Sequence, residues 1–196
     1  FVAPSPALQE AREAARADQW EVLSNGTTAL LAFLTRTMQA SSVVTIGTDA
    51  GVSALALLEG MSDHGVLTSI DPDAERQAAA RKVLSLARIR SNQVRLITGT
   101  PLDVLPKLRD GAYDMVLING DRLEYVEYVS QALRLLRTGG IVVVNDALAN
   151  NHVADPDNED DDTLIIRETL DSVLETEEFT PVLLPVGEGL LLATKS

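Results

Sequence analysis

The chain has 196 residues, which allows one α/β domain with a sizeable core, and 45% of the residues are hydrophobic. Its net charge of −13, with 16 basic against 29 acidic residues, argues against a nucleic-acid partner, which needs a basic face. No apolar run reaches the roughly 18 residues of a membrane span, so no membrane partner is expected. The lack of cysteine excludes disulfides and thiolate chemistry and is compatible with a reducing, cytoplasmic location.

The pattern of apolar residues predicts alternating strands and helices. Helical patterns open the chain at residues 7–20 and 26–38. Short β-branched apolar runs then predict five buried strands, at residues 43–46, 66–70, 94–98, 114–118 and 141–144. Helical stretches are expected between and after them, at residues 52–59, 73–88, 102–108, 123–136 and 164–175.

Two further apolar runs, at residues 182–186 and 190–194, are joined by Gly187-Glu188-Gly189 and predict a hairpin. The whole pattern therefore predicts an α/β fold: a doubly wound, seven-stranded, mostly parallel sheet that ends in an antiparallel hairpin. We expect a single domain over residues 1–196. Residues 1–40 would form helices over the ligand cleft, and residues 41–196 would form the α/β core.

A glycine turn follows the first predicted strand. Gly47 allows a tight turn and a close approach to a ligand, and the helix that begins after Gly51 offers free N–H groups to an anion. The spacing G-x-x-x-G differs from the G-x-G-x-x-G of pyrophosphate binding. Such a turn also occurs for geometric reasons alone.

Asp71 follows the second predicted strand, 24 residues after Gly47. A carboxylate at this strand end can accept both hydroxyls of a ribose. Alternatively, Asp71 caps a helix that begins at Pro72. The combination of glycine turn and acid favours a nucleotide-type ligand.

These segments and two later ones resemble a known family. In order, residues 47–53, 69–72, 113–118 and 135–140 match the landmarks of class I S-adenosylmethionine-dependent methyltransferases. The chain is most similar to the O-methyltransferase branch that includes the catechol and caffeoyl-CoA enzymes, from about Leu23 to Lys195. The resemblance implies a Rossmann-like methyltransferase fold, S-adenosyl-L-methionine as cofactor and a small, hydroxyl-bearing acceptor of aromatic or related type. By family analogy it also implies a homodimer.

The resemblance assigns the loop after the first strand to the methionine part of the cofactor. Gly47, Thr48 and Gly51 would line it, and Ser53 would hold its carboxylate. In this branch the residue two before the first loop glycine is usually acidic and meets the cofactor ammonium. Here that residue is Thr45, which offers a hydrogen bond without charge.

The resemblance assigns the nucleoside to later segments. Asp71, followed by Pro72, would hold the ribose. Thr100 and Pro101 would flank the adenine, with Thr100 replacing an acid often found there. Leu23 would close over the cofactor.

The family also implies a divalent cation (Mg²⁺ or Mn²⁺), held by an Asp after the fourth strand and an Asp-Asn pair after the fifth. The corresponding residues are Asn119, Asn145 and Asp146, so one carboxylate remains where two are usual. Hard cations depend on carboxylate charge, and we therefore expect metal binding to be weak or absent. Asn119 is also a predicted cofactor contact.

Three residues are candidates for catalysis. Arg122 occupies the position of the family's basic lysine; it stays protonated and so can stabilise a phenolate but cannot act as a base. The alternative for Arg122 is a surface ion pair with Glu124 or Glu127. Asp146 and His152 could assist deprotonation, although His152 also fits a solvated loop that continues into the acidic run at residues 155–162.

Two other functions remain open from the sequence. A cofactor-binding regulatory protein or catalytically impaired methyltransferase homologue would fit the altered catalytic positions. An NAD-dependent oxidoreductase would fit the strand–helix alternation, but the missing third glycine and the terminal hairpin argue against it.

Overall fold

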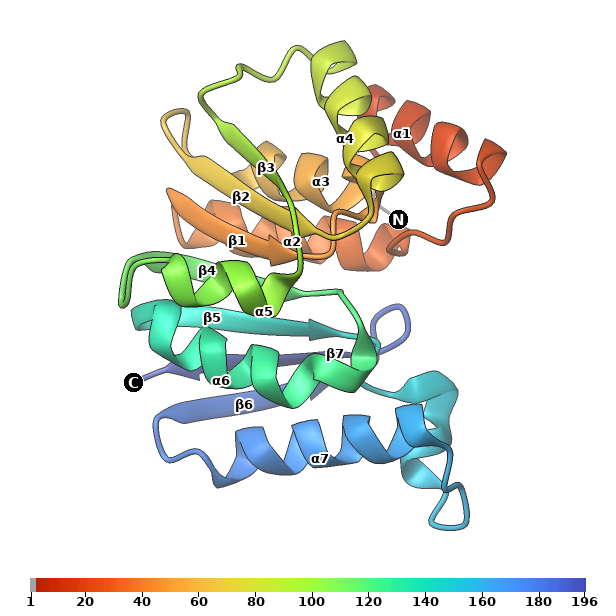
Figure 1. Cartoon of the computed structure of the whole chain (residues 1–196), viewed down its shortest axis with the longest axis vertical. Helices are drawn as coiled ribbons and strands as arrows, with labels where there is room; N and C mark the ends of the chain where they lie inside the picture. Colours follow the sequence, from red (N-terminus) through yellow and green to blue (C-terminus); the bar gives the residue numbers. More distant parts are fainter. Residues whose placement is uncertain (1–2) are drawn as a thin grey trace.

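The structure is a computed structural model and describes residues 3–196 (Figure 1). Within that range seven strands form one sheet in the order β3-β2-β1-β4-β5-β7-β6. Strands β1 to β5 are parallel, while β7 runs antiparallel to β5 and β6 antiparallel to β7. The strands are β1 (Ser42–Ile46), β2 (Val66–Asp71), β3 (Val94–Thr98), β4 (Tyr113–Ile118), β5 (Leu136–Asn145), β6 (Phe179–Leu184) and β7 (Leu190–Lys195). The predicted fold class is therefore confirmed.

Helices cover both faces of this sheet. They are α1 (Pro6–Ala17), α2 (Asn25–Thr37), α3 (Val52–Gly60), α4 (Ala74–Leu86), α5 (Pro101–Val104), α6 (Tyr125–Leu135) and α7 (Asp161–Glu175). Short 3-10 turns lie between them: η1 (Asp49–Gly51), η2 (Leu105–Lys107), η3 (Arg122–Glu124) and η4 (Ala149–Ala154). The first helices begin where the chain supplies a capping hydroxyl: Ser5 accepts the N–H of Leu8 at 3.2 Å, and Ser24 accepts that of Thr27 at 3.1 Å.

Alternate residues of each central strand belong to different hydrophobic cores, because successive side chains point to opposite faces. Val43 and Leu117 pack in a core with residues of α1 to α4. Val44 and Ile118 pack in a second core with residues of α6, α7 and η2. In Figure 1, α5, α6 and α7 lie in front of the sheet, and α2 and α3 lie behind it.

The order of the strands indicates at which edge of the sheet a ligand would bind. The chain winds outward from β1 in one direction through β2 and β3, and from β4 in the other through β5. In such sheets ligands bind beyond the carboxyl ends of the strands where the winding reverses, here between β1 and β4. Gly47 directly follows β1 and Asn119 directly follows β4.

Several predicted boundaries differ from the structure. The predicted helix at 102–108 divides into α5 and η2. Strand β5 is longer than predicted because Leu136 pairs with Tyr113 before an irregularity in the register. Helix α7 begins at Asp161 rather than 164, since acidic residues are favourable in the first turn of a helix. Strand β6 begins at Phe179 and includes Pro181, which an edge strand tolerates.

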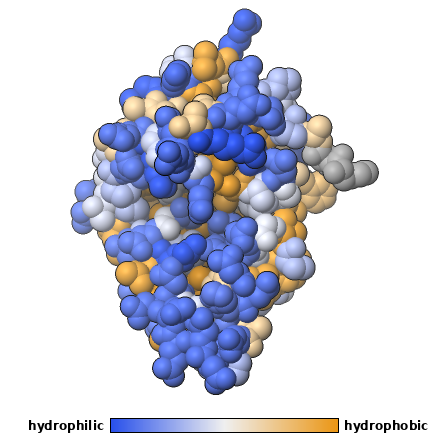
Figure 2. Space-filling model, turned by 90° about the vertical axis from the view of Figure 1, so that its right-hand side faces the viewer, coloured by the Kyte–Doolittle hydropathy of each residue, from blue (hydrophilic) through white to orange (hydrophobic). Residues whose placement is uncertain are grey.

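Within residues 3–196, no helix combines the length and apolar character that crossing a bilayer requires. Figure 2 views the side toward which the parallel strands point. Its surface is mainly hydrophilic, most densely at the lower end, and an apolar area is visible in the upper half.

Candidate active site

The turn after β1 requires glycine at its first position. Gly47 has a φ of +89°, and its N–H donates to the carbonyl of Ile70 at 2.8 Å. A Cβ at Gly47 would lie 2.1 Å from the backbone oxygen of Asn119. Any side chain at this position would therefore force the ends of β1 and β4 apart.

The rest of this turn is held in an unusual backbone conformation. Asp49, Ala50 and Gly51 have φ values of 52°, 49° and 94°. Gly51 packs closely on α4, because a Cβ there would meet the Cα of Ala80 at 3.0 Å. Left-handed φ values at non-glycine residues cost on the order of 1–3 kcal/mol each and concentrate at functional sites.

Asp71 is held by the backbone at the end of β2. Its two carboxylate oxygens accept the N–H groups of Thr48 and Asp73, each at 2.8 Å, and it is 5% exposed. A carboxylate offers about four acceptor positions, so lone pairs remain for two ligand hydroxyls. The alternative role predicted for Asp71 is wrong: α4 begins at Ala74, and Asp73 caps it through the N–H of Glu75 at 2.8 Å.

The hydroxyls predicted at the methionine end are engaged within the turn. Thr45 is fully buried and donates to the carbonyl of Gly47 at 3.0 Å. Ser53 donates to the carbonyl of Thr48 at 3.4 Å, and the Thr48 hydroxyl lies 3.0 Å from that of Ser69. These bonds stabilise the turn, and contact of these residues with the cofactor stays a prediction.

The predicted adenine contacts lie beside Asp71. Thr98 of β3 pairs with Asp71, and the chain then turns through exposed Thr100 into buried Pro101, the first residue of α5. Pro72 is exposed next to Asp71. The predicted ribose and adenine residues therefore share one end of the sheet.

The segment before α2 reaches the glycine turn through Leu23. Its N–H lies 3.3 Å from the Asp49 carboxylate, and its carbonyl accepts from the Arg12 guanidinium. Arg12 also donates to Thr28 at 2.9 Å. Burial raises the pKa of Asp49 to about 7, against the opposing effects of the Leu23 N–H and of Arg12. Leu23 thus lies against the turn, and its contact with the cofactor stays a prediction.

Asp49 is a residue of this turn that the sequence motifs do not single out. Its position inside the glycine turn, where a charged residue is unexpected, is the feature of the sequence that could have pointed to it. Its burial and its contact with Leu23 depend on the folded chain.

The residues at the metal positions are engaged with one another. The side-chain amide of Asn145 donates to the side-chain oxygen of Asn119 at 2.9 Å. Asp146 supplies the one carboxylate, and its Oδ2 is in contact with the Arg122 guanidinium. Across residues 3–196, no three or more His, Cys, Asp or Glu side chains are grouped to hold a metal ion. Because hard cations prefer several anionic oxygens, this donor set does not fit Mg²⁺ or Mn²⁺.

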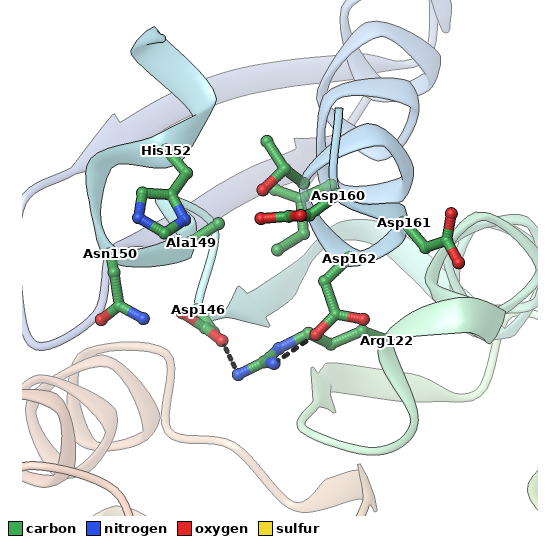
Figure 3. Close-up of a pocket in the computed structure, with 10 residues that line it drawn as sticks. Arg122, Asp146, Ala149, Asn150, His152, Asp160, Asp161 and Asp162 are labelled. Carbon is green, nitrogen blue, oxygen red and sulfur yellow. Dashed lines mark hydrogen bonds and ion pairs between the residues drawn. The ribbon is translucent and has the colours of Figure 1, made fainter. Parts of the chain in front are cut away.

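A cavity of about 330 Å³ opens beside Asp146, between the end of β5, η3, η4 and the start of α7 (Figure 3). Arg122, Asp146 and His152 all line it, so the structure brings the three predicted catalytic residues together. The first turn of α7 adds carboxylates, including Asp162.

Arg122 bridges two carboxylates in this cavity. Its Nη1 donates to Asp162 Oδ2 at 2.7 Å, and its Nη2 contacts Asp146 Oδ2 (Figure 3). The predicted alternative, a pair with Glu124 or Glu127, is wrong. The Glu124 carboxylate instead accepts the hydroxyl of Tyr128, because both lie on one side of the helix.

Asp146 is nearly buried, at 5% exposure, and has a left-handed φ of 58°. Its Oδ1 has no hydrogen-bond partner among the described residues. Burial raises the pKa of the Asp146 carboxyl, and Arg122 opposes that rise. A buried acceptor without a partner is costly, so a ligand donor is the natural partner for this oxygen.

The loop that carries His152 is held by Arg167 of α7. The guanidinium donates to the carbonyls of Val153 at 3.2 Å, Asn158 at 2.8 Å and His152 at 3.1 Å, and also contacts that of Asp155. His152 itself is exposed. The sequence indicated neither this clamp nor Asp162, because both involve residues of a segment that reads as a solvated acidic loop.

The O-methyltransferase family model matches residues 2–196, and the chain belongs to this family. It is an enzyme of the transferase class, and the sequence prediction of a methyltransferase, rather than an NAD-dependent oxidoreductase, is confirmed.

Relatives from mycobacteria share this assignment. A Mycobacterium tuberculosis (strain ATCC 25618 / H37Rv) protein named as a probable O-methyltransferase is 40% identical over 167 residues, which cover 85% of this chain and 75% of the relative. A homologue in Mycolicibacterium smegmatis (strain ATCC 700084 / mc(2)155), named as a putative O-methyltransferase, is 42% identical over 167 residues, which cover 85% of this chain and 80% of the relative.

Solved structures agree in fold. The O-methyltransferase TomG from Streptomyces achromogenes, in complex with SAM, has a TM-score of 0.91 at 27% identity, with 100% of this chain and 92% of that chain covered. A protein from Corynebacterium glutamicum has a TM-score of 0.93 at 30% identity, with the same coverage.

Proposed function

We propose that this enzyme transfers a methyl group from S-adenosyl-L-methionine to a hydroxyl of a small, aromatic or related acceptor bound in the cavity beside Asp146. One observation carries the proposal: the glycine turn and the cavity are joined through direct contacts. Gly47 lies against Asn119, Asn119 accepts from Asn145, and Asn145 precedes Asp146, which lines the cavity. A methyl donor above the turn and an acceptor in the cavity would be neighbours.

The cofactor supplies a methyl group on a positively charged sulfonium. In the proposed site, Asp71 accepts the ribose hydroxyls with the lone pairs that Thr48 and Asp73 leave open. Leu23 closes over the methionine part, and Thr100 lies on the adenine side. Because the backbone holds Asp71, little ordering is needed on binding.

The acceptor class follows from the charge of the cavity. Asp146, Asp160, Asp161 and Asp162 line it, against one cation, Arg122. Anionic acceptors such as acyl-CoA thioesters are disfavoured by this balance. We therefore propose a neutral or cationic phenol, with the reacting hydroxyl directed to Asp146.

Other properties extend this proposal. We propose one domain over residues 1–196, with the helices of residues 1–40 covering the cofactor cleft. The net charge of −13 supports a small-molecule rather than a nucleic-acid partner. A homodimer is proposed from the family resemblance, and a cytoplasmic location from the lack of cysteine.

The test is calorimetric titration with S-adenosylhomocysteine, with NAD as a control ligand, followed by methyl transfer to a panel of neutral, cationic and anionic phenols. We expect the homocysteine nucleoside to bind, NAD to be silent, and Asp71→Ala to weaken binding at least about tenfold through loss of a buried acceptor. Asp73→Ala is the matched control, because it removes a helix cap and an exposed ion pair with Arg76 but leaves the Asp71 carboxylate in place. Binding without turnover of any acceptor would favour the impaired or regulatory homologue instead.

A further inference from the structure

The positively charged group in the proposed acceptor cavity is a side chain, the guanidinium of Arg122. Arg122 extends from η3, and its two terminal nitrogens contact Asp162 on one side and Asp146 on the other (Figure 3). The two carboxylates come from α7 and from the end of β5. A guanidinium held at two points is fixed in orientation, and it presents further N–H donors in the same plane.

The surrounding groups favour this cation over a metal ion. The side chains of Asn119 and Asn145 are hydrogen-bonded to each other at 2.9 Å. The carboxylate of Asp146 is neutralised by Arg122, and a divalent ion placed against it would meet a like charge. Asn119 Oδ1 and Asp146 Oδ2, two of the oxygens that a metal ion would use, are therefore already engaged within the chain.

One buried atom in the cavity lacks a partner. Only 5% of Asp146 is exposed. Its Oδ2 contacts Arg122, but its Oδ1 accepts no hydrogen bond among residues 3–196. A donor bound at Oδ1 lies next to the guanidinium as well. An acceptor hydroxyl satisfies both groups: its O–H donates to Asp146, and its oxygen accepts an N–H of the Arg122 guanidinium.

From this geometry we propose that Arg122 is a catalytic residue that binds and stabilises the acceptor oxyanion, so that methyl transfer proceeds without a divalent cation. This inference rests on the proposed function. The hydroxyl proton passes to the Asp146 carboxylate while the acceptor oxygen forms the new O–C bond. The C–S bond of the methyl donor breaks, and its electron pair stays on sulfur. Arg122 stabilises the negative charge that develops on oxygen before this bond is complete.

The experiment uses the full chain, freed of metals with EDTA, and three variants: Arg122→Gln, Arg122→Lys and the control Arg109→Gln, an exposed arginine outside the cavity. The probe is 4-nitrocatechol, whose phenolate absorbs visible light, titrated against pH with S-adenosylhomocysteine present. We expect the bound probe to ionise at lower pH than the free probe in the wild type and in Arg109→Gln. In Arg122→Gln that shift is lost, and in Arg122→Lys it is partly kept.

Kinetics and metal binding complete the test. EDTA leaves the wild-type kcat/KM for the acceptor within twofold, and Arg122→Gln lowers it by about 10²–10³, as for loss of one oxyanion donor. Added Mn²⁺ stays free by electron paramagnetic resonance.

Three outcomes overturn the inference: activity abolished by EDTA and restored by Mn²⁺, an unchanged kcat/KM in Arg122→Gln, or a wild-type enzyme that leaves the ionisation of the probe unshifted. Calorimetry with S-adenosylhomocysteine separates this failure from that of the proposed function. If one of these outcomes occurs while the nucleoside binds to wild type and variants alike, only the role of Arg122 is refuted. If the nucleoside does not bind at all, the cofactor assignment itself is refuted.

Discussion

The carboxylate of Asp49, in the turn after β1, accepts the N–H of Leu23, which lies 26 residues earlier in the chain, at 3.3 Å. This contact joins the segment before α2 to the glycine turn. Asp49 is 5% exposed, and burial raises its pKa from 3.8 to about 7. Because burial raises this pKa against the opposing effect of the Leu23 N–H, the burial of Asp49 makes stability depend on pH.

The sign follows from proton linkage. Between about pH 4 and pH 7 the unfolded chain has lost this proton while the folded chain retains it, so stability falls as pH rises through that window. Asp49→Asn removes the titration, and asparagine tolerates the left-handed φ and can still accept from Leu23. We expect the free energy of unfolding of the variant, relative to that of wild type, to be a few kcal/mol larger at pH 8 than at pH 5, since one pKa unit corresponds to about 1.4 kcal/mol. Urea unfolding at both pH values measures this, and an equal difference at both would contradict it.

The close approach of Gly47 to Asn119 gives a second prediction. Gly47→Ala places a methyl group 2.1 Å from the Asn119 carbonyl oxygen, so the ends of β1 and β4 must separate. We expect a total loss of more than about 3 kcal/mol of stability, which exceeds the roughly 1–2 kcal/mol that an alanine in a left-handed conformation costs by itself. Loss of S-adenosylhomocysteine binding should accompany it.

Gly111→Ala is the matched control for Gly47. Gly111 also has a positive φ, +60°, but a Cβ there meets nothing within 4 Å. It should lose only about 1–2 kcal/mol and keep full binding. Equal effects in thermal unfolding of the two variants would show that steric contact with Asn119 is unimportant.

The Arg167 clamp predicts an effect on the acceptor without one on the cofactor. Arg167→Ala frees the backbone carbonyls of the segment from His152 to Asn158. Hydrogen bonds from a charged donor contribute about 1.5–3 kcal/mol, so amide hydrogen exchange at residues 149–160 should accelerate at least about tenfold. The acceptor KM should rise while the affinity for S-adenosylhomocysteine stays constant. Arg109→Ala serves as the control, and unchanged exchange in Arg167→Ala would refute the clamp.

Asp114 anchors the start of the sheet on the side away from the site. It accepts the N–H groups of Ser41 at 2.7 Å and Ser42 at 2.9 Å, and Arg137 donates to it at 2.6 Å. Although burial alone would raise the pKa of Asp114, these donors hold it below its usual value. Asp114→Ala should therefore cost at least about 2 kcal/mol, because it leaves part-buried N–H groups without partners.

The same substitution has a defined pH dependence. A lowered pKa contributes stability above about pH 4 that is lost as pH falls through the folded-state value. The difference between wild type and Asp114→Ala should therefore shrink in acid, as measured by urea unfolding at pH 3 and pH 7. Asp110→Ala, which breaks an exposed pair with Arg134, should cost under about 1 kcal/mol; a larger loss there would weaken the comparison.

The sequence by itself determined the fold class and the family, and it predicted which residues would hold the methyl donor. Strand–helix alternation, the glycine turn at Gly47 and the acid at Asp71 are local patterns, and parallel strands necessarily bring their carboxyl ends to one edge. The start of α7 was predicted three residues too late, because the acids of its first turn resemble the acidic loop that precedes them.

The tertiary structure alone decided which groups meet around the cavity beside Asp146. Arg122 pairs with Asp162, 40 residues later, rather than with its neighbours on η3 and α6, and Asn145 meets Asn119 across two strands. The buried state of Asp49 likewise depends on Leu23 from a distant segment. The packing of elements that are far apart in the chain decides which charges face one another and which buried oxygen is left without a partner. The spacing of residues along the sequence does not predict these contacts.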